Sequence, residues 1–270
     1  MSGPDAVRSR LPLEGLLSRP NLGVGVALAL LTALAWLHLA GTDAAGPAAG
    51  HAPHAHTGMM HAAPEAWQSA DVGEAFVMWL VMAIAMMLPT AAPAILSFAD
   101  IIRGAGRASP GTGRLAGFVG GYLAVWWGFG ALATAAQWGL AVAATGIPGF
   151  RAEGPLFGGA LLVVAGLYQF SALKNLCLTR CRSPLTFFLT HWREGTRGAV
   201  YLGVRHGMHC VGCCWALMAL MLCAGTMNVA WTAALTALML AEKVLPRGLL
   251  IGRAVGVGLI AWGGALLASA

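Results

Sequence analysis

Residues 74–99 read EAFVMWLVMAIAMMLPTAAPAILSFA, and no charged side chain follows Glu74 within them. An α-helix needs about 20 predominantly apolar residues to cross the hydrocarbon core of a bilayer. Backbone groups in that core must bond to one another, because no water is available there. The stretch is therefore predicted to be a transmembrane helix, and Pro89 and Pro93 predict a kink in its second half.

The rest of the chain repeats this pattern. Of its 270 residues 58% are apolar and 10% are charged, against about 25% charged residues in soluble domains. The sequence predicts an all-α fold, a polytopic transmembrane bundle of about seven helices. The count falls to six if the last pair forms a hairpin that does not fully cross. The predicted helices cover residues 21–40, 74–99, 115–145, 154–173, 198–224, 228–241 and 248–268.

Basic residues alternate between the predicted connections and set the orientation. They gather before the first helix and in every second connection thereafter, whereas the other connections contain only Arg151. Cytoplasmic loops are enriched in Lys and Arg, so the N-terminus is predicted to be cytoplasmic and the C-terminus outside. The net charge of +6 is explained by this topology and does not indicate a nucleic-acid partner. The expected location is a bacterial inner (cytoplasmic) membrane, with the lipid bilayer as a partner.

Four regions follow from this topology. Residues 1–20 form a cytoplasmic segment and 21–41 the first transmembrane helix. Residues 42–73 form a flexible outer loop rich in His and Met, and 74–270 a metal-binding transmembrane domain. Four His and two Met fall within eleven residues of the loop: His51, His54, His56, Met59, Met60 and His61. They predict a segment that recruits metal from the outer compartment, although a low-complexity polar linker would have a similar composition.

Soft metal ligands are densest in RHGMHCVGCCW, residues 205–215. His206, Cys210 and Cys214 follow i, i+4, i+8 spacing, and His209 and Cys213 form a neighbouring i, i+4 pair. This spacing places them on one side of a helix. Polar and ionisable groups are expensive inside a membrane, so two His and three Cys in one helix predict a metal site. A single Cys is more often a small buried apolar residue.

A row of methionines supports the same interpretation. Met78, Met82 and Met86 repeat every four residues, and Met87 adjoins them. Such a row alone is more typical of packing, because Met fills irregular gaps. The opposite directions of the two predicted helices, however, place Met82–Met87 at about the depth of Cys210–Cys214. Thioether and thiolate ligands together favour copper as Cu(I), and zinc is less expected.

Two further sequence features stand near the predicted inner surface. Cys177 and Cys181 form a weaker pair that would receive metal there or remain as reduced thiols. Glu242 and Lys243 are expected to form an interfacial ion pair. The sequence contains no phosphate-binding loop, no HExxH motif and no DKTG phosphorylation sequence. An enzyme or an ATP-driven pump is therefore not expected.

Three motifs resemble a bacterial family described as predicted metal-binding integral membrane proteins. They are MWxxMxxAMMLP at 78–89, YQxxxLKxxCLxxCRxP at 168–184 and GxxxGxxCxGCCW at 203–215. Some members of that family are associated with tyrosinase and regarded as membrane copper chaperones. The resemblance covers roughly residues 74–246 and implies copper handling. Its motif positions are Met78, Met82, Met86, Met87, Cys177, Cys181, His209, Cys210, Cys213 and Cys214, whereas the His/Met loop lies outside it.

These observations predict a non-enzymatic membrane copper protein. It would act as a Cu(I) metallochaperone or passive carrier that delivers copper to a copper enzyme, tyrosinase-like or other, or exchanges it with a soluble copper chaperone. The alternative is a membrane thiol–disulfide protein that relays electrons through Cys pairs. The Met row and the predicted difference in depth between the two Cys pairs argue against that alternative. A haem protein using His206 or His209 and a purely structural subunit are the remaining interpretations.

Overall fold

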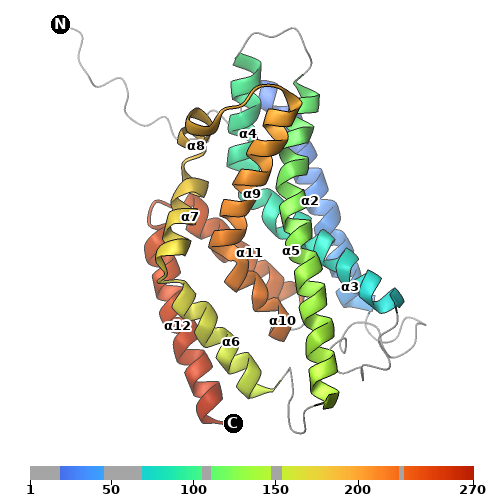
Figure 1. Cartoon of the computed structure of the whole chain (residues 1–270), viewed down its shortest axis with the longest axis vertical. Helices are drawn as coiled ribbons and strands as arrows, with labels where there is room; N and C mark the ends of the chain where they lie inside the picture. The colour runs from blue at the N-terminus through green and yellow to red at the C-terminus, as the bar shows by residue number, and fades with distance from the viewer. Residues whose placement is uncertain (1–18, 46–68, 105–110, 147–153, 225–227) are drawn as a thin grey trace, which may run out of the picture.

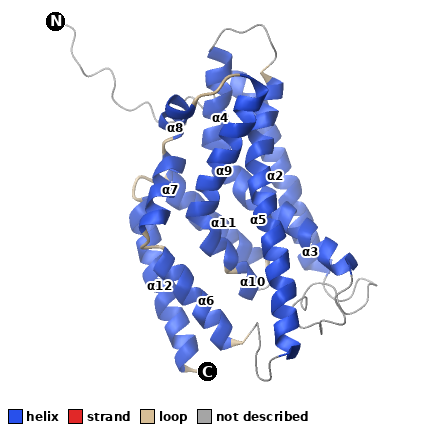
Figure 2. Ribbon diagram, viewed as in Figure 1, coloured by secondary structure: helices blue, strands red, loops and turns tan. Residues whose placement is uncertain are grey.

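A computed structural model describes residues 19–45, 69–104, 111–146, 154–224 and 228–270. These residues form helices and short connections without a strand, which confirms the all-α prediction (Figures 1 and 2). The helices are α2 (Arg19–Ala45), α3 (Ser69–Met82), η4 (Ala83–Met87), α4 (Leu88–Gly104), α5 (Thr112–Gly146), α6 (Pro155–Tyr168), α7 (Ala172–Arg182), α8 (Pro184–His191), α9 (Gly195–Ala219), α10 (Met221–Ala224), α11 (Val229–Val244) and α12 (Gly248–Ala268).

Several of these helices have the length and composition of membrane spans. Within the described ranges, four are long and apolar enough to cross a bilayer: residues 21–42, 71–104, 112–144 and 248–268. The bent pair α6 and α7 would make a fifth. Each of the seven predicted segments falls on one or more helices, with α11 shorter at 16 residues. The number of crossings and the cytoplasmic N-terminus remain predictions.

The chain near Pro89, where the sequence predicted a kink, departs from regular α-helical hydrogen bonding. Proline has no N–H to donate to the carbonyl four residues earlier, which is that of Ala85. The indole Nε1 of Trp36 in α2 donates to this carbonyl at 3.0 Å. The chain forms a π-helical turn, η4, just before the proline, and such turns often occur at functional sites. The result is a buried turn that carries Met86 and Met87.

Glycines allow α5 and α9 to pack closely along their length. A Cβ atom on Gly203 would lie 2.0 Å from the carbonyl oxygen of Phe118, and one on Gly121 would lie 2.4 Å from that of Val200. Small residues at such crossings let helix backbones approach in a bilayer. α6 and α12 pack in the same way, since a Cβ on Gly166 would lie 2.7 Å from the Gly256 carbonyl. The contacts between α5 and α9 fix the position of α9 along the axis of α5.

We predict that Gly203→Ala strongly destabilises the bundle. The added methyl group cannot occupy its position unless α5 and α9 separate, and overpacking typically costs about 1–3 kcal/mol or more. Thermal unfolding of the detergent-purified protein should show a lower midpoint. Gly128→Ala is the matched control, because a Cβ at Gly128 meets no atom within 4 Å. Equal midpoints for the two variants would contradict the packing argument.

The segment after α6 differs from its prediction. The sequence predicted a helix to residue 173 followed by a polar inner loop. Instead α6 ends at Tyr168, the chain bends by 63°, and α7 begins where the Ser171 hydroxyl accepts a hydrogen bond from the Lys174 N–H at 3.1 Å. α7 then packs against α9. Because α7 is rich in Lys and Arg, its sequence indicated a polar loop, although it forms a helix that contributes to the core.

Candidate metal centre

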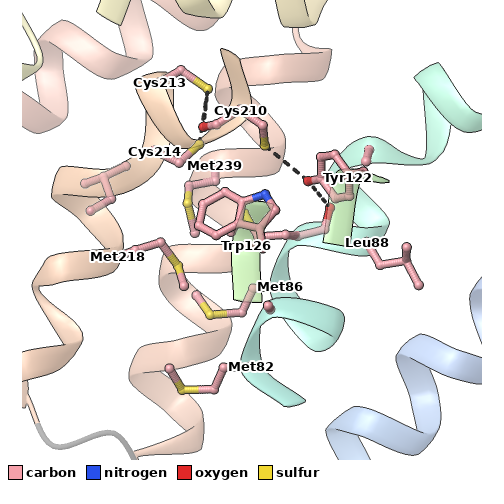
Figure 3. Packing of buried hydrophobic residues seen from close by; sticks show 14 of the residues in the cluster. Met82, Met86, Leu88, Tyr122, Trp126, Cys210, Cys213, Cys214, Met218 and Met239 are labelled. Carbon is pink, nitrogen blue, oxygen red and sulfur yellow. Dashed lines mark hydrogen bonds between the residues drawn. The ribbon is translucent and has the colours of Figure 1, made fainter. Parts of the chain in front are cut away.

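Three thiols of α9 form the centre of the site. Cys210, Cys213 and Cys214 are each 1% exposed. The Cys213 thiol lies 3.3 Å from the sulfur of Cys214 and donates to the carbonyl oxygen of Cys210 at 3.2 Å (Figure 3). The helical spacing read from the sequence thus places these three side chains together in the protein interior.

A fourth thiol reaches this group from α7. The side chain of Cys181 lies close enough to Cys210 and Cys213 for the thiols to interact. Cys177 packs against Gly212, where an added Cβ would come within 2.6 Å of the Cys177 sulfur. The glycine within the CxGCC motif therefore permits the approach of α7. The predicted difference in depth between the two Cys pairs is wrong, because the bend after Tyr168 returns α7 to the side of α9.

Buried thioethers continue from the thiols into the bundle. Met82 and Met86 are fully buried in the same core as the cysteines. Figure 3 shows their sulfur atoms following those of Met239 and Met218 away from the cysteines. Sequence reasoning missed Met239 of α11 as a component of this row. The one feature of the sequence near Met239 that could have indicated this role is its i, i+4 spacing to Lys243. The predicted ligands Met78 and Met87 are buried as well, but nothing in the described part of the chain connects their sulfur atoms to the thiols.

Tyr122 connects the methionine segment to the cysteine helix. Its hydroxyl donates to the carbonyl oxygen of Met87 at 3.0 Å and lies 3.1 Å from the sulfur of Cys210. Either the tyrosine hydroxyl or the thiol can be the donor in the contact between Tyr122 and Cys210. α5 thus mediates between the two predicted metal-binding helices. The principal neighbours of η4 are α2, α3, α4, α5 and α11 rather than α9.

Lys243 supplies a buried positive charge at the thiols. It is 9% exposed, and its ammonium group donates to the sulfur of Cys210 at 3.0 Å and to the hydroxyl of Thr90 at 2.8 Å. The expected ion pair between Glu242 and Lys243 is therefore wrong. Glu242 instead pairs with Lys174 at 2.7 Å, because adjacent residues on a helix point in different directions. Lys243 is left to face the cysteines.

The two predicted histidines occupy different surroundings. His206 is 3% exposed, lies beside the rings of Tyr122 and Phe187, and has no hydrogen-bond partner for Nδ1 within the described structure. His209 is oriented toward α8, with its ring edge-on to Phe187 at 6.0 Å. Of the two, His206 is the one next to the thiols. The loop ligands His51, His54, His56, Met59, Met60 and His61 lie outside the described residues.

The arrangement has the chemical character of a soft-cation site. In the ranges that the structure describes, no three His, Cys, Asp or Glu side chains are already arranged so that they could hold a metal ion. Thioethers extend the available ligands beyond those residue types. Thiolate and thioether sulfur prefer Cu(I), whereas hard cations require oxygen ligands.

Comparison with known proteins gives one match. The family model described as PpoB2, copper chaperone, matches residues 76–266, a range that includes every thiol and thioether of the site. No curated protein and no solved structure is similar enough to the chain to count as a match.

Proposed function

The chain belongs to the PpoB2 copper chaperone family, and from this premise we propose that it binds Cu(I) inside a membrane-spanning helical bundle and passes the ion to a partner. The observation that carries the proposal is the convergence of α7 and α9. It brings four thiols together next to one buried ammonium group. The proposed ligands are drawn from Cys181, Cys210, Cys213 and Cys214.

A charge count is consistent with Cu(I) held by two thiolates. Two thiolates and one Cu(I) carry a net charge of −1, which the ammonium group of Lys243 would neutralise at 3.0 Å from Cys210. Two thiolates and one Zn²⁺ carry no net charge, so zinc would need a third thiolate to balance the lysine. Uncompensated charge is costly in a buried site. The cluster therefore suits a monovalent soft cation held by two thiolates, with thioether or imidazole as an additional ligand.

The row of thioethers supports a route into the site. Met82 and Met86 precede Met218 and Met239 on the way to the cysteines (Figure 3). Weak, similar ligands in succession allow a soft cation to exchange from one to the next. We propose that the outer His/Met loop collects copper and that this row delivers it to the thiols. The proposed setting is a bacterial inner membrane with a cytoplasmic N-terminus.

The proposed recipient is a copper enzyme, tyrosinase-like or other, or a soluble copper chaperone. A chaperone role requires that copper is bound and released and that no substrate is chemically converted, so the protein is proposed not to be an enzyme. The family description supports a role in copper delivery.

The experiment that tests this function is metal analysis of the full chain purified in detergent under reducing conditions. We predict copper in a fixed ratio to protein, removable by a Cu(I)-specific chelator and not displaced by excess zinc. Thiol trapping in cells discriminates the redox alternative, because a Cu(I) site keeps its cysteines reduced whereas a relay accumulates disulfides. Protein that carries zinc alone, or that cycles through disulfides without copper, would exclude the proposed function.

A further inference from the structure

A cavity of about 620 Å³ lies beside the thiol cluster. Its lining comes from α2, α4, α9 and α11 and from the junction of α7 with α8. Asp100, whose side chain is 51% exposed, lines it together with Cys181, His206 and Lys243. Small-molecule sites typically enclose about 300–1,000 Å³. The cavity is therefore large enough for a compound the size of a short peptide.

Two cations line this cavity without a carboxylate partner among the described residues. The guanidinium of Arg182 donates only to backbone oxygens, those of Glu242 at 2.5 Å and Pro246 at 3.2 Å. Lys243 donates to a thiol and a hydroxyl. The carboxylate of the lining, Asp100, is paired with Arg103 at 2.9 Å. The cavity lining, with Arg182 and Lys243 against Asp100, thus has a net positive charge and suits an anion.

The cavity also reaches a thiol. Among the five cysteines whose side chains the structure describes, Cys181 is partly exposed and the other four are buried. Cys181 lines the cavity and lies near Cys210 and Cys213 of the cluster. The imidazole of His206 adds a buried nitrogen, Nδ1, that has no hydrogen-bond partner in the described structure. A molecule in the cavity would therefore meet Cys181 before any other thiol of the cluster.

We propose that this cavity binds a small anionic thiol, which exchanges copper with the cluster at Cys181. The inference rests on the proposed function. In the exchange, the incoming thiol forms a sulfur–copper bond while the bond between copper and Cys181 breaks. The proton of the incoming thiol passes to the released Cys181 sulfur, so no electron is transferred and the step is reversible. Arg182, whose charge is not needed to balance the copper site, attracts the anionic groups of the incoming molecule. Glutathione is a suitable probe because it is an anionic thiol of fitting size.

The first test uses metal-free protein, so that it does not depend on copper. Two thiol reagents of matched size are compared, sulfonatoethyl methanethiosulfonate (anionic) and trimethylammonioethyl methanethiosulfonate (cationic). Modification of Cys181 is followed by mass spectrometry, and each rate is divided by the rate with free 2-mercaptoethanol. We expect the anionic reagent to be favoured on the order of tenfold, as charged clefts concentrate oppositely charged molecules. S-methylglutathione, which carries no free thiol, should slow the modification by occupying the cavity.

Two variants, Arg182→Gln and Ala94→Phe, assign the effect to the cavity, and Arg180→Gln is the control for the first. Arg182→Gln should remove most of the anionic preference, whereas Arg180→Gln, an exposed arginine on the same helix, should keep it. Ala94→Phe fills the cavity without changing its charge and should slow both reagents. If either variant fails to fold, the comparison of the two reagents on the unaltered protein still decides the question. Equal normalised rates for the two reagents would overturn the proposal.

The second test uses copper-loaded protein. Glutathione should exchange copper faster than cysteamine, a cationic thiol, at equal thiol concentration, and Arg182→Gln should reduce that difference. Copper that stays bound to the cluster but exchanges at equal rates with both thiols would overturn the inference and leave the proposed function intact. If the protein shows the anionic preference at Cys181 but binds no copper, the proposed function is excluded and the anion-binding cavity is supported.

Discussion

Replacing Cys210, Cys213 and Cys214 together with serine is expected to abolish tight Cu(I) binding. Serine has nearly the size of cysteine, but its hydroxyl stays protonated and is a hard, poor ligand for a soft cation. Loss of groups that only support metal ligands typically lowers affinity about 10–100-fold, so loss of the ligands themselves should exceed that range. The measurement is competition with a Cu(I)-specific chelator on the purified full chain.

The triple variant needs controls that separate binding from folding. Its helix content and thermal midpoint without copper should stay close to those of the unaltered protein, because each substitution replaces one small buried side chain by another. Cys177→Ser is the matched single control. Cys177 is a buried thiol of α7, the helix that packs against α9. Its contact is with Gly212 rather than with the cluster. Unchanged copper affinity in the triple variant would exclude the proposed site.

The sequence predicted the parts of the fold that depend on local chemistry. The long apolar stretches identified the helices, because apolar length is what a bilayer selects. The i, i+4 spacing of Cys210 and Cys214 identified the thiol row, because helical geometry alone places those side chains together. Both inferences need only neighbours along the chain, and both agree with the structure.

Long-range features could not be predicted in the same way. The bend after Tyr168 depends on packing of α7 against α9, so Cys181 was expected in a loop although it is part of the thiol cluster. The contact of Lys243 with Cys210 joins residues 33 positions apart. The bridge through Tyr122 spans 88 positions. No periodicity in the sequence identifies such contacts. A lysine placed one turn after Met239 on an apolar helix was nevertheless an available signal.

Lys243→Met is expected to lower Cu(I) affinity about 10–100-fold, the range typical for a group that supports metal ligands. The reason is the charge of the loaded site. Two thiolates and Cu(I) leave one negative charge in a buried environment, and methionine cannot neutralise it. Methionine preserves much of the length and packing of the lysine stem, so the change is mainly one of charge. Chelator competition on the purified variant measures the loss.

Lys243→Met lowers copper affinity, but it should not lower the thermal stability of the metal-free protein. There the buried ammonium group of Lys243 donates to the sulfur of Cys210 and to the hydroxyl of Thr90, and a buried ion pays a large desolvation penalty. Its removal should leave the metal-free unfolding midpoint unchanged or raise it. The Thr90 hydroxyl retains its bond to the Met87 carbonyl at 2.9 Å. Copper should therefore raise the midpoint less in Lys243→Met than in the unaltered protein.

Lys243→Arg distinguishes a charge effect from a packing effect. Arginine keeps the positive charge in a larger, planar group, so copper affinity should recover most of its value even if the metal-free midpoint falls. If lysine served only to pack α11 against the cluster, the order would be reversed: methionine would preserve copper binding and arginine would impair it. Lys243 is assigned to the metal site if copper affinity depends on a positive charge at position 243. The stability of the metal-free protein should instead depend on the size and shape of the side chain there.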